Sequence, residues 1–358
     1  MKERAPYIDI LKAIGIISIV IGHASINIPG TNIEICKFVY AYHLMIFFFT
    51  AGFCFKKEYA AEPYQYIGRR LKSMLPLYFK YNLIFVLLHN LFVRYHFVDE
   101  GKGIYGIQEG ISQILSAVAF TTAETFLGAF WFVPLLFFAL GLFVICFYWA
   151  EKWKKPILGH GVSIVLAALV GLFLCKRNVQ LPYRLQIAVL GIPILYLGYF
   201  CKSGWGKVSR FVKWYGAIAS GAVVYLVVTK VGMIELSVNS IISPILFYPV
   251  TVLGIYFCLG LGKLLLHCRL LSRGMAVIGQ NSFHIMALHL MIFKIVDLVY
   301  ILLTRSDIVL LETYPHSFEL WIIYYIAGVG IPVIIIMFLK KVGSCLKAKL
   351  KINIIRTN

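Results

Sequence analysis

Ten apolar segments, each near the length of a membrane-spanning helix, constrain this chain more than any other feature. A helix needs about 20 consecutive apolar residues to cross the hydrocarbon core of a bilayer. The composition supplies them, because 61% of the 358 residues are hydrophobic and only 14% are charged. We therefore predict an all-α polytopic membrane protein. Its spans are predicted near residues 8–26, 38–55, 75–93, 130–150, 157–175, 186–201, 211–229, 240–262, 279–303 and 319–339.

One further stretch, residues 104–129, fits no single span, and we expect an interfacial or re-entrant helix plus a loop at the outer face. Neither an internal repeat nor an appended soluble segment is visible, so residues 1–358 are predicted to form one integral membrane domain. The eight cysteines are scattered singly, without a CxxC pair. This pattern predicts neither a disulfide framework nor a zinc site.

The basic residues sort strongly to one side of the predicted spans. If the N-terminus is cytoplasmic, 23 of the 34 Lys and Arg residues lie in inner segments and 8 in outer segments. Cytoplasmic loops carry such an excess of positive charge. We therefore predict that both termini are cytoplasmic and that the protein is multi-pass in the plasma membrane. The net charge of +19 then follows from topology, and no nucleic-acid partner is expected.

The first segment, "PYIDILKAIGIISIVIGHASI" at residues 6–26, carries Asp9, Lys12 and His23. Ionisable residues inside a membrane are costly and usually face a partner or a cavity. At 100° per residue the three side chains share one face, and Lys12 and His23 lie roughly 16 Å apart along the axis. Two interpretations stay open. Asp9 and Lys12 form a salt bridge at the helix end while His23 is a hydrogen-bonded core residue, or all three line a polar cavity. In the second case His23 suits a general base acting on a hydroxyl.

This opening segment resembles that of the membrane-bound acyltransferase-3 family, in which a basic residue is followed, after ten residues, by a histidine. Lys12 and His23 stand at these positions, within the pattern R-x-x-YID-x-LK-x-IGII-x-x-x-x-GH at residues 4–23. The similarity is greatest to the fucose-4-O-acetylase-like branch.

Four later segments carry the same resemblance in the same order. They are "AYHLMIFFFTAGFCF" (41–55), "RRLKSMLPLY" (69–78), "FWFVPLLF" (130–137) and "IGQNSFHIMALH" (278–289). The first departs from the family at Leu44–Met45, where Met–Pro is frequent, and at Ala51, where serine is usual. The match spans nearly the whole chain. Members of this family are integral membrane O-acyltransferases of bacterial polysaccharides, peptidoglycan and related glycans.

The resemblance implies an acyl-CoA donor, with acetyl-CoA expected, and a glycan or lipid-linked saccharide acceptor entering from the outer side of the lipid bilayer. It implies that His23 is the general base and that His289 lines the catalytic cavity. Without the resemblance, His289 is equally well interpreted as a packed, hydrogen-bonded histidine of the core. Asp9 and Lys12 are expected to hold the inner part of the site. The oxyanion stabiliser is not assigned, and His289 and Asn281 are its candidates.

Five further residues are candidates for binding the acceptor, and the first three keep a structural alternative. His43 either approaches the acceptor hydroxyl or bonds a backbone carbonyl. Glu124 either orients a catalytic histidine or holds a sugar hydroxyl; the structural alternative is a solvent-exposed acidic residue in a loop. Trp131 either stacks on a sugar ring or anchors the interface. Asn281 and Ser282 match the family's ninth-helix motif.

Arg69, Arg70 and Lys72 precede the third predicted span on the inner side. They suit the phosphates of coenzyme A, although positive charge is expected there for topological reasons alone. We expect no metal, because the histidines lack metal-ligand spacing such as HExxH.

A transporter or flippase for a glycan, lipid or amino acid is the alternative function, because charges inside the membrane also suit that role. Transporters frequently contain inverted repeats, and none is visible here. Whether the chain acts alone or as a homodimer stays open.

Overall fold

The computed structural model describes residues 6–27, 33–121, 124–312 and 320–356. These residues form helices, short 3-10 turns and one isolated bridge between Glu235 and Ser240. The helices are α1 (Pro6–Asn27), α2 (Ile33–Tyr40), α3 (Met45–Cys54), α4 (Pro63–Arg94), α5 (Ile107–Val118), α6 (Phe132–Glu151), α7 (Pro156–Lys176), α8 (Leu185–Ser203), α9 (Trp205–Phe211), α10 (Trp214–Val231), α11 (Phe247–Leu266), α12 (Arg269–Gln280), α13 (Ser282–Thr304) and α14 (Trp321–Arg356).

Ten helical stretches of the described residues are long and apolar enough to cross a bilayer. Each coincides with one of the ten predicted segments, which confirms the all-α polytopic class. Parts of the sequence predictions lie outside the described residues, among them position 4 of the first motif, residues 122–123 of the stretch 104–129 and residue 319 of the last span.

The second span is broken in the middle. α2 ends at Tyr40, and a turn over residues 41–44 precedes α3. In this turn the Ala41 amide donates to the Phe38 carbonyl at 3.3 Å, a bond over three residues where an α-helix has four. The turn contains neither glycine nor proline, and the average hydropathy of residues 38–55 is high, so the sequence predicts one continuous helix. The break places His43 between two helices.

The third helix begins twelve residues earlier than predicted, at Pro63, and its first turns are polar and largely exposed. Proline suits the first turn of a helix because its missing N–H needs no partner there. Hydropathy marks only the part of α4 that matches a bilayer. Arg69, Arg70 and Lys72 therefore lie on a helix and not in a loop.

Other spans begin after their predicted first residues: α10 begins at Trp214 instead of residue 211, and the eighth and ninth spans are also shorter at their starts. Residues 240–246 form the bridge to Glu235 and a turn, so α11 begins at Phe247. The ninth span begins at Ser282, because a break at Asn281 separates α12 from α13. Between α4 and α6, the stretch 104–129 contains the amphipathic helix α5, which packs on α4, and the 3-10 turn η3 (Thr125–Leu127).

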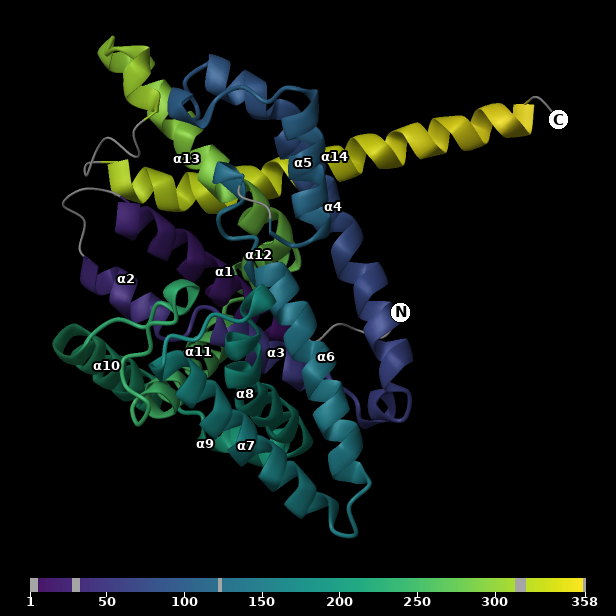
Figure 1. Cartoon of the computed structure of the whole chain (residues 1–358), viewed down its shortest axis with the longest axis vertical. Coiled ribbons are helices and arrows are strands. Elements are labelled where there is room, and N and C mark those ends of the chain that lie inside the picture. Colours follow the sequence, from purple (N-terminus) through teal and green to yellow (C-terminus); the bar gives the residue numbers. More distant parts are fainter. Residues whose placement is uncertain (1–5, 28–32, 122–123, 313–319, 357–358) are drawn as a thin grey trace.

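α1 is the central helix of the fold. Its span is buried over 78% of its residues, against 22% for α7. A helix that is apolar on all sides is expected in such a position. α1 packs against α2, α3, α11, α12, α13 and α14. In Figure 1, α14 crosses α13 and its C-terminal half projects beyond the other helices, while α7 and α8 lie beside α6 at the opposite end.

Candidate active site

The polar residues at the start of α1 are joined to α12. Asp9 is only 4% exposed; its Oδ1 lies 3.6 Å from the Lys12 ammonium, and its Oδ2 accepts a 3.0 Å hydrogen bond from the Gln280 amide. The close approach requires Gly279, because a Cβ there would lie 1.8 Å from the Asp9 carbonyl oxygen. This contact fixes the carboxylate that holds Lys12.

A cavity of about 250 Å³ opens beside these residues, and we call it the inner cavity. Its polar lining is Asp9, Lys12, Gln280 and Ser282. Met74 of α4 borders it from the side, and Phe132 and Met286 close its far end. The shared helical face predicted for α1 thus begins in a cavity, with an ion pair at its edge.

A second cavity, of about 340 Å³, lies around the other end of α1, and we call it the outer cavity. Its lining includes His23, His43, Trp131, Arg184, Glu235 and Ser237. Phe132 and Met286 line it as well. Two apolar side chains are therefore shared between the cavities that contain Lys12 and His23.

His23 is paired with a second imidazole in the wall of the outer cavity. The ring centroids of His23 and His289 are 5.2 Å apart at an angle of 53°. His289 is fully buried, and its Nδ1 donates a 3.0 Å hydrogen bond to the Ile285 carbonyl one turn earlier. A neutral imidazole with Nδ1–H has a bare Nε2. That Nε2 is buried with no hydrogen-bond partner among the described residues, so it is a base without a proton.

His43 reaches the outer cavity from the break between α2 and α3. Its ring stacks on Tyr40 at 4.4 Å. Tyr40 packs tightly on α1 beside His23, since a Cβ at Gly22 would lie 2.4 Å from its ring. The glycine before His23 thereby allows a second histidine to share its cavity.

The far wall of the outer cavity is built from loops. Tyr183 and Arg184 both adopt left-handed backbone conformations, with φ of 55° and 57°, which are uncommon for residues other than glycine. The Arg184 guanidinium lies 4.8 Å from the centre of the Trp131 ring and donates to the Ser237 carbonyl. Glu235 holds the Ser237 amide at 3.0 Å. These contacts orient a cation, an aromatic face and a carboxylate around one space.

A third cavity, of about 350 Å³, also has His23 in its wall, and we call it the side cavity. It is lined further by Asp99, Lys102, Lys294 and Glu312. His23 therefore borders two cavities at the same end of α1, built by different segments.

The sequence pattern of the acyltransferase-3 family, an acyltransferase domain, matches residues 5–340. The chain is a member of the acyltransferase-3 family. No curated protein and no solved structure matches it significantly. With ten candidate spans, it is a multi-pass membrane acyltransferase. Its assignment to the fucose-4-O-acetylase-like branch stays a prediction.

Two of the predicted acceptor residues of this acyltransferase have other partners. The Glu124 carboxylate lies 3.3 Å from Nδ1 of His89, away from His23. Burial raises the pKa of Glu124, and His89 offsets part of that shift. Asn281 donates to the Val277 carbonyl at 2.8 Å and accepts from Lys340 at 2.9 Å. Both side chains hold neighbouring segments together.

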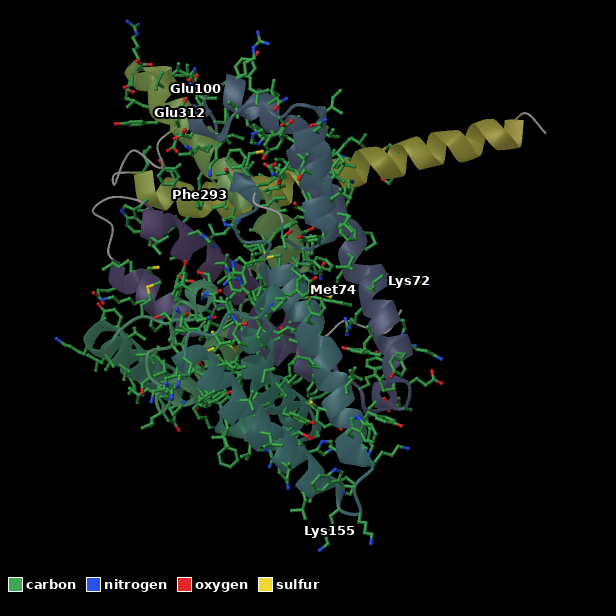
Figure 2. All side chains as sticks on the ribbon, viewed as in Figure 1. Lys72, Met74, Glu100, Lys155, Phe293 and Glu312 are labelled. Atoms are coloured by element: carbon green, nitrogen blue, oxygen red, sulfur yellow. The ribbon has the colours of Figure 1, made fainter. Side chains whose placement is uncertain are left out.

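The three basic residues of α4 lie near the inner cavity in the acyltransferase. Arg70 is one turn before Met74 and so shares its helix face; its guanidinium lies 5.0 Å from the Tyr66 ring centre. Arg69 packs on Tyr59 at 5.6 Å. In Figure 2, Met74 lies on the inward side of α4 and Lys72, which is exposed, on the outward side.

Sequence reasoning missed Tyr40, Arg184, Glu235 and Gln280 as parts of this site. From the sequence, Arg184 was counted only among the eight Lys and Arg residues of the predicted outer segments. Its left-handed conformation and its distance in sequence from Trp131 leave no periodic signal. Gln280 stands in the quoted motif "IGQNSFH", and its approach to Asp9 depends on the adjacent glycine.

Proposed function

We propose that this acyltransferase is a transmembrane O-acetyltransferase of the plasma membrane. It transfers an acetyl group from cytoplasmic acetyl-CoA to a hydroxyl of a cell-surface glycan or lipid-linked saccharide. One observation carries the proposal. Cavities at opposite ends of α1 contain Lys12 and His23, respectively, and share the walls Phe132 and Met286.

The inner cavity suits the donor. Lys12 lies at its edge with a side chain 34% exposed, and Arg70 shares the face of α4 that reaches it. Charge-assisted hydrogen bonds to phosphate are strong, so these groups and Arg69 suit the nucleotide end of coenzyme A. The apolar walls suit the uncharged pantetheine arm, whose thioester then lies near Met286.

The outer cavity suits the acceptor and the chemical step. One nitrogen of His23 accepts the proton of the acceptor hydroxyl while the oxygen attacks the thioester carbonyl carbon. The tetrahedral intermediate collapses, the carbon–sulfur bond breaks, and the coenzyme A thiolate takes the proton. The ring of His289, with its bare Nε2, packs against the His23 ring at a centroid distance of 5.2 Å. We propose that this Nε2 accepts a proton from His23 during the reaction and so favours the tautomer that leaves the attacking side of His23 unprotonated. His289 is thus a positioning residue.

Trp131, Arg184 and Glu235 suit the sugar. An aromatic face is the usual apolar platform for a sugar ring, and charged groups beside it bind hydroxyls strongly. His43 is the remaining imidazole of the outer cavity and suits a hydrogen bond to the acceptor. Ser282, in the inner cavity, suits the donor better than the acceptor.

The test is hydrolysis of acetyl-CoA by the purified full-length acyltransferase in detergent, where water replaces the acceptor. Replacing His23 with alanine is expected to lower the rate by roughly 10²- to 10⁴-fold, the usual contribution of a general base. Thiol release is followed with a chromogenic disulfide.

His284→Ala is the matched control. It removes an imidazole of α13 that bonds Tyr81 at 2.7 Å and lines none of the three cavities. Unchanged turnover in His23→Ala, with the same melting temperature, would rule out His23 as the general base. Equal losses in both variants would point to a folding defect.

A further inference from the structure

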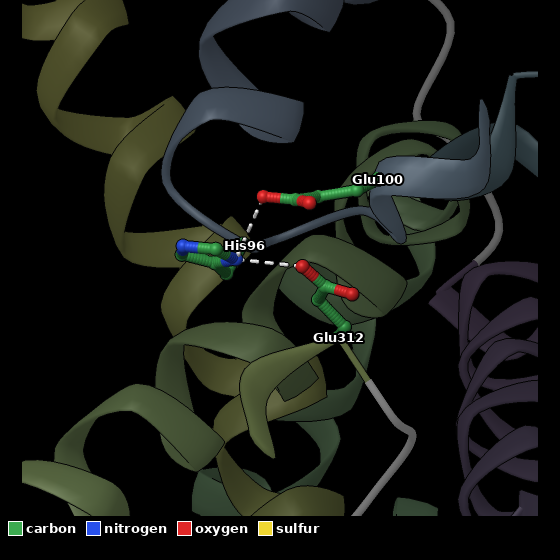
Figure 3. Close-up of side chains that lie close together, drawn as sticks. All are labelled: His96, Glu100 and Glu312. Atoms are coloured by element: carbon green, nitrogen blue, oxygen red, sulfur yellow. Dashed lines mark hydrogen bonds and ion pairs between the residues drawn. The ribbon is translucent and has the colours of Figure 1, made fainter. Parts of the chain in front are cut away.

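Three side chains of types that ligate metals converge outside the proposed catalytic residues, and one of them, Glu312, lines the side cavity. Nδ1 of His96 lies 2.6 Å from Oε1 of Glu312 and 3.7 Å from Oε1 of Glu100. One ligand atom from each residue lies within 4.8 Å of the other two. Figure 3 shows both carboxylates pointing at the same imidazole edge. His96 and Glu100 belong to one segment, and Glu312 lies more than 200 positions further along the sequence.

The backbone around His96 and Glu100 is held without using their side chains. His96 adopts a left-handed conformation, with φ of 60°, directly after α4. Asp99 accepts a 2.6 Å hydrogen bond from the Gly101 amide and so begins the 3-10 turn η2 (Glu100–Lys102). A left-handed residue is sparsely populated and persists only where its surroundings demand it.

The backbone around Glu312 is held in the same way. Asp307 accepts a 3.0 Å hydrogen bond from the Val309 amide at the start of η6 (Ile308–Leu311). The Lys294 ammonium donates to the carbonyl of Leu311 and, at 3.2 Å, to that of Glu312. The Glu312 carboxylate is left to face His96, with its side chain only 15% exposed.

A proton on Nδ1 serves only one of the two carboxylates. It makes a hydrogen bond to Glu312, while Glu100 at 3.7 Å is beyond hydrogen-bond range. A divalent cation binds both at once. Ligand atoms around a tetrahedral zinc ion with bonds near 2.1 Å lie about 3.4 Å apart, within an ångström of both observed distances. Glu100, whose side chain is 69% exposed, is free to adjust.

We propose that His96, Glu100 and Glu312 bind one Zn²⁺ ion. An imidazole nitrogen with two carboxylate oxygens is a borderline donor set that favours zinc over magnesium or calcium. The side cavity next to Glu312 leaves room for the water ligands that complete the coordination. This proposal departs from the sequence expectation of no metal site, because spacing along the chain does not reveal a ligand from a distant loop.

The bound ion joins the segment after α4 to the turn after α13. Glu312 lines the side cavity together with His23. The ion therefore fixes one edge of an approach to the proposed catalytic histidine. Zinc binding and acyl transfer are separate claims, because the three ligands take no part in the chemical step.

The test is isothermal titration of ZnCl₂ into the full-length protein, purified in detergent, freed of its affinity tag and stripped with a chelator. The exposed thiols of Cys54, Cys268 and Cys345 are alkylated first, since they also bind zinc. Wild type is expected to bind one Zn²⁺ and to melt at a higher temperature with it. Glu100→Gln is expected to weaken binding roughly tenfold or more, since even supporting groups of metal ligands contribute that much.

Glu109→Gln, an exposed carboxylate of α5, and His267→Ala, an imidazole beside α11, are the matched controls and are expected to bind zinc as wild type does. His96→Ala is expected to abolish binding. Should it fail to fold, Glu100→Gln decides alone. The proposal is overturned if wild type binds no saturable Zn²⁺, if Glu100→Gln binds it unchanged, or if MgCl₂ binds equally well.

Discussion

At the scale of single residues, the proposed mechanism depends on how two imidazoles divide their protons. The Ile285 carbonyl fixes the proton of His289 on Nδ1, and this leaves Nε2 as an acceptor on the ring that packs against His23. Other nucleophilic sites have a comparable arrangement, in which a third group hydrogen-bonds to the histidine base and sets its tautomer. Here the third group is a backbone carbonyl of the helix itself.

His289→Ala is expected to lower kcat for acetyl-CoA hydrolysis by about 10²-fold while leaving KM unchanged, because the donor is proposed to bind in the inner cavity. His289→Gln, which retains an acceptor atom, is expected to recover part of the rate. Steady-state kinetics on both variants checks this. A higher KM with an unchanged kcat would assign His289 to donor binding instead.

Glu124 gives a pH-dependent prediction. Burial raises its pKa, so the folded state holds this proton more tightly than the unfolded state does. Its contribution to stability is then present at low pH and lost as pH rises through the folded pKa. Glu124→Gln removes that loss. The melting temperature of the variant, relative to wild type, should therefore increase from about pH 4.5 to about pH 7.5.

The same variant separates a structural from a catalytic role for Glu124. Acetyl-CoA hydrolysis is expected to be unchanged, because the carboxylate contacts His89 and lines neither cavity beside His23. A difference in melting temperature that shrinks with rising pH would mean that the His89 pair outweighs burial.

At the scale of elements, the packing of α12 on α1 positions the donor end of the site. Gly279→Ala places a methyl group 1.8 Å from the Asp9 carbonyl oxygen. The helices must separate, which is expected to cost about 1–3 kcal/mol, as for other overpacked cores. Gly274→Ala, on the same helix with open space around it, should instead stabilise by about 0.5–1 kcal/mol. Thermal melting in detergent compares them, and equal effects would contradict this account.

The elements also show how far the sequence could be used for prediction. The ten spans were predictable because each has the length and apolar composition that a bilayer requires. The break at residues 41–44 was not, since "AYHLM" contains neither glycine nor proline and only tertiary contacts, such as Tyr40 on Gly22, favour a turn there. The early start of α4 was missed because a helix that leaves the membrane becomes polar without unwinding.

For the site, helical periodicity placed Lys12 and His23 on one face of α1, and the structure puts each in a cavity. Family resemblance, and not periodicity, pointed to His289. Arg184 and Glu235 come from loops far apart in the sequence, and their contact depends on how those loops fold over Trp131. Nothing in a single sequence encodes such a distance.

At the scale of the whole molecule, the predicted orientation assigns every segment to one side of the membrane. Figure 2 places Glu100 and Glu312, predicted to be outer, at the opposite end from Lys155, predicted to be inner. The exposed cysteines offer a direct check, because Cys268 and Cys345 belong to predicted cytoplasmic segments and Cys54 lies at the predicted inner end of the second span.

A membrane-impermeant maleimide is expected to leave these three cysteines unlabelled in intact cells and to label them after the cells are opened. Lys102→Cys, in the predicted outer turn η2, should be labelled in intact cells. Mass spectrometry of the purified protein reads out each site. Labelling of Cys268 in intact cells would reverse the orientation and place His23, rather than Lys12, on the side of cytoplasmic acetyl-CoA.

The two side chains between the cavities have an electrical consequence. The potential of a resting membrane drives each elementary charge across it with about 2.3 kcal/mol per 100 mV. An open polar path through this protein would therefore let ions flow and dissipate that potential. Phe132 and Met286 stand where the inner and outer cavities meet and act as the insulating layer of the bilayer at that point. An uncharged acyl group on its pantetheine arm can displace the flexible Met286 side chain. A hydrated ion would have to lose its water between these two apolar side chains, which is energetically very unfavourable. In the proposed mechanism, the acyltransferase then passes an acetyl group across the membrane while the membrane potential is maintained.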